Sequence, residues 1–255
     1  MDDISIKSEI ENSWNTEADY YDSRVSHGVL TGEEKQMWIK AFESVLPKSS
    51  PPLKILDVGC GTGAMGLLLS EMGHEVTGID LSVNMMSVGK KKAKKFNSKM
   101  IFQKGDAENP PFEDNTFDGV VNRHLLWTLP HPDTALKNWC RVIKPKGRVF
   151  VIDGVWNDQK ISTRMKMKIG LSLENLIERS PHGESLYSKN LNESLPNCGG
   201  VPEDKAKEYF SNAGLSDIKV IDLSHIRRNQ RKRLEWYERL YTSLSYYLIC
   251  GEKRG

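Results

Sequence analysis

Hydrophobic positions along the chain follow two spacings, and these predict strands that alternate with helices. Short apolar runs predict buried strands at 55–58, 75–80, 100–104, 117–122, 148–152, 218–223 and 244–250. Apolar residues that recur every three or four positions predict helices over 4–22, 33–46, 64–72, 82–96, 132–142, 161–177 and 202–213. Such an alternation is typical of an α/β fold with a mostly parallel sheet.

A glycine-rich turn follows the first predicted strand. Gly59, Gly61 and Gly63 occupy alternate positions directly after it. Because glycine lacks a β-carbon, the backbone there can take left-handed conformations and approach a ligand closely. The helix predicted at 64–72 points its first amides toward the same ligand. A strand, a glycine turn and a helix N-terminus together form a cradle for a nucleotide-sized molecule.

Carboxylates beside this turn bear on the charge of the ligand. The residues from Gly61 onward also satisfy the G-x-G-x-x-G pattern of nicotinamide cofactors. Asp57, at the end of the strand, would repel a pyrophosphate, whereas it would attract a ligand that carries an ammonium and a sulfonium. Asp80 ends the second strand, where a carboxylate can accept hydrogen bonds from both hydroxyls of a ribose. Either cofactor needs that acid, so Asp80 does not discriminate between them.

Three motifs in order carry a resemblance to a known family. LDVGCGTG at 56–63, GIDLS at 78–82 and GDAENPPFEDNTFDGVV at 105–121 resemble the class I S-adenosylmethionine-dependent methyltransferases. The resemblance implies a Rossmann-like α/β fold with a seven-stranded, mostly parallel sheet flanked by helices and an antiparallel last strand. It implies S-adenosyl-L-methionine as the cofactor and S-adenosyl-L-homocysteine as its product. One departure is Lys146, which stands where the family usually has glycine.

The resemblance also implies which residues hold the cofactor. In the family, the glycine turn holds the methionine part, the acid ending the second strand holds the ribose, and an acid after the third strand holds the adenine amine. The cofactor-binding residues implied here are Tyr21, Asp57, Gly59, Cys60, Gly61, Gly63, Asp80, Leu81, Asp106, Ala107 and Asn122.

The N-terminal segment adds to the resemblance. Trp14, Ala18, Tyr21 and Asp22 are similar to the W-x(3)-A-x(2)-Y-D segment of small-molecule methyltransferases, a branch that includes ubiquinone and menaquinone biosynthesis enzymes. In that branch the segment folds over the cofactor. The resemblance therefore implies that Tyr21 borders the methionine end and that His27 faces the methyl acceptor.

Candidate acceptor chemistry follows the fourth strand. Ligands of open parallel sheets bind outside the carboxyl ends of the strands, and Arg123, His124 and Trp127 lie just after this one. His124 is a candidate general base near neutral pH, or it only hydrogen-bonds substrate or loop backbone. Trp127 either contacts a ligand or packs in the core. Arg123 and His27 are further candidates for contact with the methyl acceptor. Asp153, after the fifth strand, orients the acceptor or forms a turn.

A decoy motif precedes the fourth strand. Asn109 to Phe112 resemble the N-P-P-[FY] motif of enzymes that methylate planar amino groups. In those enzymes the motif ends the fourth strand, whereas here it comes before it. We therefore interpret it as a proline-stiffened loop and exclude an exocyclic-amine methylase.

Residues 154–200 are too long for an ordinary connection between a strand and a helix. The amphipathic helix at 161–177 within them could line the acceptor pocket, pack two subunits together or cap the sheet. We expect an N-terminal helical cap at 1–50, a cofactor-binding core at 51–153, a lid with the acceptor specificity at 154–200, and the C-terminal part of the core sheet at 201–255.

Composition narrows the partners. The 255 residues contain 36 Lys and Arg and 34 Asp and Glu, and a net charge of +2 predicts no strong attraction to nucleic acid or anionic membranes. The lysines at 90–95 are interpreted as a solvated face. The basic residues at 227–233 form a solvated surface or attract an anionic acceptor or another chain. Four dispersed cysteines favour neither a metal site nor disulfides, and no apolar run would span a membrane. We expect a cytoplasmic monomer or homodimer.

The predicted function is transfer of a methyl group from S-adenosylmethionine to a nucleophile of a small molecule. No metal is required, because the positively charged sulfur already activates the methyl group. The acceptor atom, whether O, N, S or C, stays open. Two alternatives remain: a nicotinamide-dependent oxidoreductase and a non-catalytic nucleotide-binding module.

Overall fold

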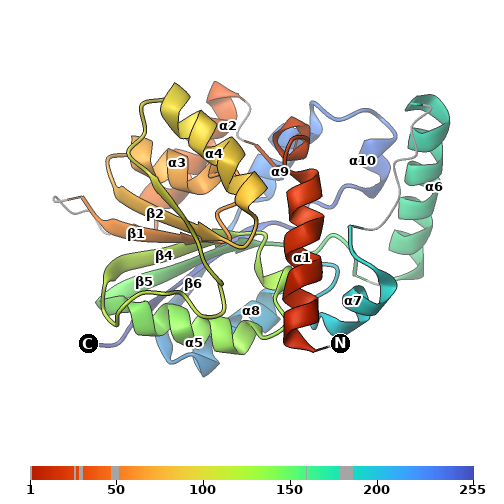
Figure 1. Ribbon diagram of the computed structural model, residues 1–255. Coiled ribbons are helices and arrows are strands. Elements are labelled where there is room, and N and C mark those ends of the chain that lie inside the picture. Colours follow the sequence, from red (N-terminus) through yellow and green to blue (C-terminus); the bar gives the residue numbers. More distant parts are fainter. Residues whose placement is uncertain (1, 26, 29–30, 47–51, 159, 179–185) are drawn as a thin grey trace.

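The central sheet of the computed structural model has seven strands in the order β3-β2-β1-β4-β5-β7-β6 (Figure 1). The strands are β1 (Lys54–Val58), β2 (Glu75–Asp80), β3 (Ile101–Lys104), β4 (Phe117–Arg123), β5 (Ile143–Asp153), β6 (Leu215–Asp222) and β7 (Tyr247–Lys253). Strands β1 to β5 pair in parallel, while β7 is antiparallel to both β5 and β6. The predicted Rossmann-like sheet with an antiparallel last strand is confirmed.

The structure describes residues 2–25, 27–28, 31–46, 52–158, 160–178 and 186–255. Its helices are α1 (Asp3–Glu17), α2 (Gly32–Glu43), α3 (Ala64–Glu71), α4 (Val83–Lys95), α5 (Pro132–Val142), α6 (Ile161–Glu178), α7 (Lys189–Ser194), α8 (Glu203–Asn212), α9 (Ser224–Arg231) and α10 (Glu238–Tyr241). Short 3₁₀ turns cover Tyr21–Ser23 and Leu126–Thr128. The expected boundary between residues 50 and 51 lies outside the described residues. None of the described helices is both long and apolar enough to cross a bilayer.

Helices cover both faces of the sheet, and each face has its own core. One core joins α2, α3, α4 and α9 to residues such as Ile55 and Val121. The other joins α5 and α8 to residues such as Leu56 and Val120. These neighbouring positions alternate between the two cores, as side chains of a strand must. The fully buried Trp38 of α2 and Trp139 of α5 are large members of the two cores.

Some predicted boundaries need correction. The first helix ends at Glu17 rather than Asp22, and the chain then turns through Tyr21–Ser23. The fifth strand begins at Ile143 rather than Arg148. Lys146 has a φ of 66°, which is a left-handed conformation that glycine adopts more easily than lysine. This is the position at which the family usually has glycine. The KPKG stretch is therefore an irregularity within β5, not a turn before it.

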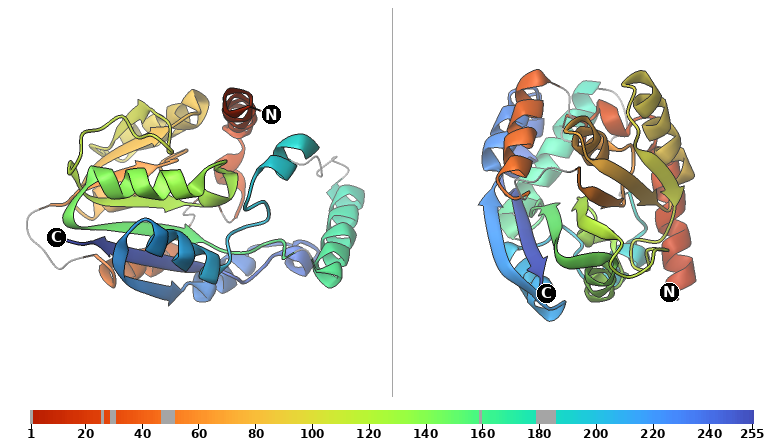
Figure 2. Two further views of the ribbon diagram at one scale, coloured as in Figure 1. Left: turned by 90° about the horizontal axis from the view of Figure 1, so that it is seen from below. Right: turned by 90° about the vertical axis from the view of Figure 1, so that its left-hand side faces the viewer.

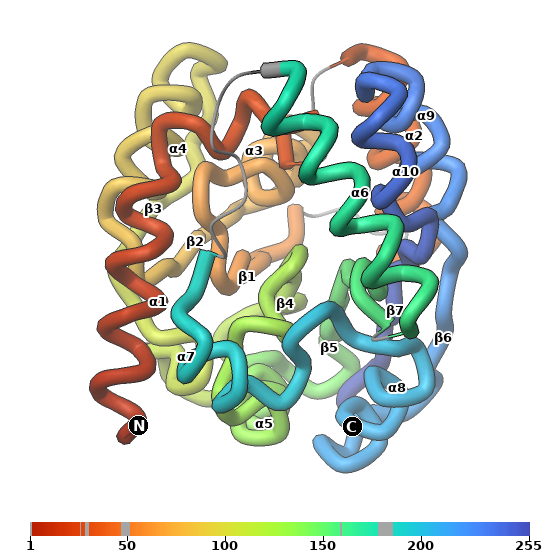
Figure 3. Tube along the Cα trace, turned by 90° about the vertical axis from the view of Figure 1, so that its right-hand side faces the viewer, coloured from red at the N-terminus to blue at the C-terminus, as the bar shows by residue number. Residues whose placement is uncertain are grey.

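Several helices stand around the carboxyl ends of the parallel strands. Figure 3 looks onto these ends, with α1 and α7 on one side and α6 and α10 on the other. The residues Ile6, Ile10, Tyr187, Leu191 and Leu195 form a third, smaller apolar cluster that joins α1 to α7. Helix α6 lies at the edge of the molecule, beyond the ends of the strands (Figure 2).

Candidate functional site

A pocket opens at the carboxyl ends of β1, β2 and β4, under α1. Its empty volume, which includes open solvent at the mouth, is about 930 Å³. The predicted site residues that line it are Tyr21, Asp57, Gly59, Cys60, Gly61, Asp80, Leu81, Asp106, Ala107, Arg123 and His124. The structure therefore brings most of the predicted site together.

The turn after β1 is built from left-handed glycines, as its spacing predicted. Gly59, Gly61 and Gly63 have φ values of 63°, 51° and 78°. A β-carbon on Gly59 would lie 2.5 Å from Cδ1 of Leu125, so packing excludes a side chain there as well. The Gly61 amide donates to Oδ2 of Asp80 at 2.8 Å, which ties the turn to the end of β2.

Two carboxyl groups flank this turn, one buried and one half-buried. Asp57 is 2% exposed, its Oδ2 accepts a hydrogen bond from the Gly66 amide at 2.9 Å, and burial raises its pKa to about 7. Burial raises the pKa of Asp80 to about 6, against the opposing effect of hydrogen bonds from the Ser82 and Gly61 amides. A cationic or hydroxyl-bearing ligand would favour the ionised form of both groups.

A third carboxyl group, Asp106, lies at the far end of the pocket. Its Oδ2 is 2.7 Å from Nζ of Lys7 on α1, and the same ammonium is 2.7 Å from Oε2 of Glu108. The Ala107 carbonyl is occupied, because it accepts a hydrogen bond from Trp139 Nε1 at 2.7 Å. Lys7 was not predicted as a site residue, because no local sequence pattern links it to Asp106, which lies far away in the chain.

Helix α1 is fixed over this end of the pocket by further polar contacts. The side-chain oxygen of Asn15 accepts from the Ser82 hydroxyl at 2.7 Å and from the Asn84 amide at 3.2 Å. Lys104 is 2.6 Å from Glu11 of α1. The N-terminal segment thus folds over the pocket, as its resemblance implied.

His124 occupies an unusual position at the end of β4. Its φ is 56°, and its amide donates to the Ile152 carbonyl at 2.9 Å. Its Nε2 lies 3.2 Å from Nη2 of Arg227 and 3.2 Å from the Tyr246 hydroxyl. Burial, followed by the charge of Arg227, lowers the pKa of His124 well below its usual range. The imidazole is therefore neutral.

Arg123 and Tyr21 form the wall beside His124, and His27 packs against Tyr21. The rings of Tyr21 and His27 stack at 4.4 Å, and Nη2 of Arg123 donates to the His27 carbonyl. Burial and the nearby arginines lower the pKa of His27 to about 3, so this ring is also neutral. Nη1 of Arg123 and Nδ1 of His27 are buried without a partner among the described residues. The Arg123 guanidinium also lines the pocket, so its unpartnered nitrogen is available to a ligand there.

Five predicted site residues do not line the pocket within the described part of the chain. Gly63 instead packs against Phe102 and begins α3. His27 lies behind Tyr21, against which it stacks. The other three are Asn122, Trp127 and Asp153.

Asn122 and Asp153 are fully buried behind the pocket rather than exposed to it. Asn122 precedes Arg123 in β4, and neighbouring residues of a strand point to opposite faces. Asp153 is the last residue of β5 and pairs with Tyr247 rather than forming a turn. Its Oδ1 accepts from the Gly154 amide at 2.7 Å, while its Oδ2 has no partner among the described residues. Burial raises the pKa of Asp153 to about 7.

Trp127 packs within an aromatic cluster, as its alternative role proposed. Its ring lies 5.2 Å from Tyr187 and 5.4 Å from Trp156, and Trp14 is 6.3 Å away. The Trp14 Nε1 donates to the Tyr187 hydroxyl at 2.8 Å. The cluster joins α1 and the 3₁₀ turn after β4 to the segments on either side of α6.

Only part of the cationic stretch at 227–233 is the solvated face that we expected: Arg228 and Lys232 are exposed, whereas Arg227 and Arg233 are not. Arg227 packs its guanidinium 4.1 Å from the Tyr246 ring centroid, and Arg233 is 2.5 Å from the fully buried Glu34 of α2. A signal was available in the sequence, because Arg227 lies four residues after the apolar Leu223 and therefore on the same helix face. Lys92 was also wrongly assigned to solvent, since it contacts Asp22 at 2.7 Å.

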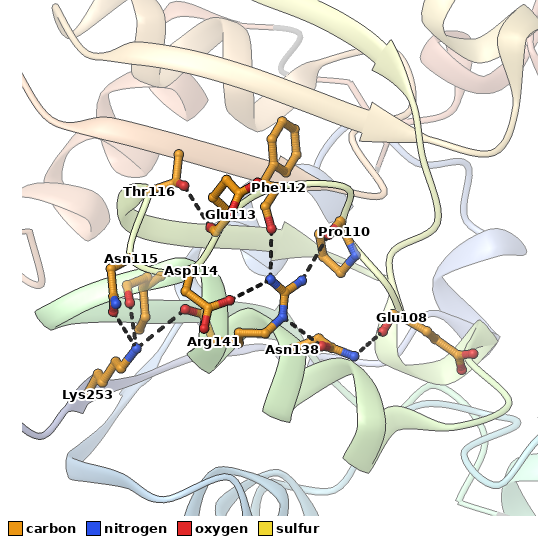
Figure 4. A network of polar contacts seen from close by, with 11 residues as sticks. Glu108, Pro110, Phe112, Glu113, Asp114, Asn115, Thr116, Asn138, Arg141 and Lys253 are labelled. Atoms are coloured by element: carbon orange, nitrogen blue, oxygen red, sulfur yellow. Dashed lines mark hydrogen bonds and ion pairs between the residues drawn. The ribbon is translucent and has the colours of Figure 1, made fainter.

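The N-P-P-F stretch is a loop, as predicted. Figure 4 shows Arg141 of α5 among the carbonyls of this loop, where it donates to Phe112 at 2.8 Å and to Pro110 at 3.1 Å. Arg141 also pairs with Asp114 at 2.9 Å. The arginine thus fixes the approach to β4, away from the strand end where an amine-binding motif would have to lie.

Helix α6 contributes no described residue to the pocket. It packs on α10, where the Tyr241 hydroxyl donates to Glu174 at 3.0 Å. Its exposed apolar side chains are Ile161, Met165, Ile169, Leu176 and Ile177. Of the three roles considered for this helix, lining the pocket is therefore wrong for the described residues. Residues 159 and 179–185 of the expected lid lie outside them.

Comparisons with known proteins agree with this geometry. The model of the methyltransferase domain family matches residues 56–151. The demethylmenaquinone methyltransferase of Staphylococcus haemolyticus is 32% identical over 202 residues, which cover 76% of this chain and 81% of that protein. A ubiquinone/menaquinone biosynthesis C-methyltransferase of Agrobacterium fabrum is 34% identical over 135 residues, covering 51% of this chain and 52% of the relative.

Solved structures share the fold at low identity. The structure of phosphoethanolamine N-methyltransferase 2 from Haemonchus contortus with S-adenosyl-L-methionine matches with a TM-score of 0.66 and 18% identity, over 98% of this chain and 60% of that one. Geranyl diphosphate C-methyltransferase from Streptomyces coelicolor, with S-adenosyl-L-homocysteine, matches with a TM-score of 0.59 and 15% identity, over 97% and 98% of the two chains.

Proposed function

Because this chain belongs to the class I S-adenosylmethionine-dependent methyltransferases and methylates a small molecule, we propose that its pocket holds donor and acceptor at opposite ends. The donor occupies the end between Asp57, Asp80 and Asp106, and the acceptor occupies the end at Arg123 and His124. One observation carries the proposal: a single pocket runs from the acids at the ends of β1 and β2 to the Arg123 guanidinium and the His124 imidazole at the end of β4.

The residues of the donor end suit the parts of this cofactor. Asp80 is placed to accept hydrogen bonds from the ribose hydroxyls, and Asp57 offers a carboxylate to the ammonium and sulfonium. Asp106 would meet the adenine amine beside the Ala107 amide, with Lys7 holding its other face. Cys60, Leu81 and Tyr21 complete the wall. S-adenosylmethionine supplies a methyl group on a positively charged sulfur, so the transfer we propose uses no metal.

The main contribution of the protein is alignment of the acceptor. Holding a nucleophile in line with the methyl carbon, in a site that excludes water, supplies several kcal/mol, up to ~7–11 kcal/mol in favourable cases. His124 acts as a hydrogen-bond donor in this proposal, not as a base. Arginine can only donate, so Nε2 of His124 accepts from Arg227 and the proton resides on Nδ1.

The test combines donor binding with turnover. We expect S-adenosyl-L-homocysteine, and not reduced nicotinamide dinucleotide, to bind in calorimetry. Methyl-labelled donor incubated with fractionated metabolite extracts should then yield a labelled small molecule. Binding of the dinucleotide would favour the oxidoreductase, and tight donor binding without any labelled product would favour the non-catalytic module.

Substitution of His124 tests the acceptor end. His124→Ala should lower kcat by roughly 10- to 100-fold, as expected for loss of one positioning hydrogen bond, with little change in donor affinity. The matched control is His131→Ala, because His131 is exposed and lies outside the pocket. An equal loss of donor affinity and turnover would assign His124 a structural role instead.

A further inference from the structure

Two guanidinium groups belong to the acceptor end of the pocket: Arg123 lines it, and Arg227 contacts His124, which also lines it. Arg123 is 8% exposed, and its Nη1 is buried without a partner among the described residues. Arg227 donates from Nη1 to Gln230 Oε1 at 3.1 Å and from Nη2 to His124 Nε2 at 3.2 Å. Burial lowers the pKa of Arg227, and the positive charge of Arg123 adds to this effect against the opposing effect of Tyr246. Burial also acts to lower the pKa of Arg123, but Tyr246, Tyr21 and Glu34 together raise it above its ordinary value.

No described carboxylate forms an ion pair with either guanidinium. The nearest buried acid of α2, Glu34, is bound by Arg233 at 2.5 Å and by Gln230 at 2.7 Å. Asp57 accepts from the Gly66 amide, and its raised pKa of about 7 leaves it only partly ionised at neutral pH. Burying a cation without an opposite charge is costly, so this pair is incomplete without an anion.

The other groups around the pair are neutral and offer hydrogen-bond donors. The His124 proton resides on Nδ1, because Nε2 accepts from Arg227. The rings of Tyr21 and Tyr246 stay protonated, because burial raises the pKa of both hydroxyls. The His27 carbonyl, Gln230 Oε1 and His124 Nε2 already accept from the two guanidiniums. The positive charge and the donors that remain favour a carboxylate or a phosphate over a neutral or cationic group.

We propose that the methyl acceptor carries an anionic group, either a carboxylate or a phosphate, which Arg123 and Arg227 bind. This inference rests on the proposed function of the pocket. The carboxylate of the donor itself can neutralise only one guanidinium, which leaves a positive charge for the second ligand. The aromatic rings of Trp14 and Tyr21 beside the pocket fit an apolar body attached to that anion.

Aromatic probes of different charge test this proposal. Benzoate, phenyl phosphate and benzyl alcohol are titrated by calorimetry into the protein saturated with S-adenosyl-L-homocysteine, and also into the free protein. We expect at least one anion to bind at least tenfold more tightly than benzyl alcohol. The stronger of the two anions identifies the group as carboxylate or phosphate. Equal affinity for all three probes would overturn the proposal.

Two substitutions of Arg227 test whether this residue causes the preference for the anionic probes. Arg227→Met should reduce the preference for the anion to less than threefold, Arg227→Lys should retain part of it, and the affinity for S-adenosyl-L-homocysteine should change by less than threefold. Arg228→Met is the matched control, because Arg228 is the next residue of α9 and its side chain is exposed. Circular dichroism checks that each variant is folded.

Other outcomes separate this proposal from the proposed function. A tenfold loss of S-adenosyl-L-homocysteine affinity in Arg227→Met, with the anion preference intact, would assign the guanidinium to the donor carboxylate and overturn the inference. Failure of the wild-type protein to bind S-adenosyl-L-homocysteine would contradict the proposed function, while the titrations into the free protein would still decide whether the anion site exists.

Discussion

The two ends of the pocket differ in how the chain builds them. The donor end comes mainly from one continuous stretch, from Asp57 to Ala107, in which strand ends and turns follow one another. The acceptor end is assembled from the turn at Tyr21–Ser23, α2, the end of β4, α9 and the residue before β7. A site made by consecutive turns leaves a motif in the sequence, whereas a site assembled by tertiary packing does not.

The largest effect should come from breaking the packing that supports the acceptor end. Glu34→Ala removes the buried partner of Arg233 and Gln230, and should lower the free energy of unfolding by about 3 kcal/mol, measured by urea denaturation. Glu33→Ala is the matched control, because this neighbour is exposed. A loss as small as that of the control would show that α9 is held in place by other contacts.

An intermediate effect is expected at the donor end. Asp80→Ala removes the ribose acceptor and the hydrogen bonds to the Gly61 and Ser82 amides. Donor affinity should fall by about 2–3 kcal/mol, roughly 30- to 150-fold in calorimetry. Glu75→Ala, at the exposed start of the same strand, should leave it unchanged. A less than threefold change in the donor affinity of Asp80→Ala would show that Asp80 does not bind the ribose.

The last prediction is a pH dependence with opposite signs for stability and binding. The pKa values of Asp57 and Asp80, about 7 and about 6, exceed the unfolded value of 3.8, so the free protein binds protons more tightly than the unfolded chain. The contribution of these two carboxyl groups to the free energy of unfolding is therefore fully present below pH 4, and it is lost as pH rises toward 7.

Donor binding should respond in the reverse direction, because the donor interacts with ionised carboxylates. Affinity should rise between pH 5.5 and pH 7, by at most ~1.4 kcal/mol per pH unit for each carboxylate. Calorimetry at several pH values, with Tm recorded in parallel, checks both signs. Donor affinity that falls over this interval would show that the protonated acids bind it.

The same difference between the two ends of the pocket explains which features could be predicted from the sequence. Regular stretches such as Glu75–Asp80 and Pro132–Val142 were predicted with the observed bounds, because apolar spacing, caps and proline positions act locally. The left-handed glycines were predicted for the same reason. Burial of Lys92 and Arg227 was not, since each depends on a partner that only the folded chain brings near.

Tertiary context also decided the details of the site. His124 was identified as a candidate from its place after β4, but its tautomer depends on Arg227, which is distant in the sequence. Asn122 was placed in the cofactor site by resemblance, and strand alternation turns it away from the pocket. The position of α6 beyond the strand ends could not be predicted either, because its apolar pattern fits several environments equally well.

The reversed direction of β7 has a consequence for how this enzyme can diversify. Strand β6 ends, and β7 begins, at the same edge of the sheet that carries the pocket. The connection between them, from Leu223 to Tyr246, therefore never has to cross the body of the protein to rejoin the sheet. This connection can change in length and composition during evolution while the glycine turn stays intact, which allows one donor site to serve unrelated acceptors.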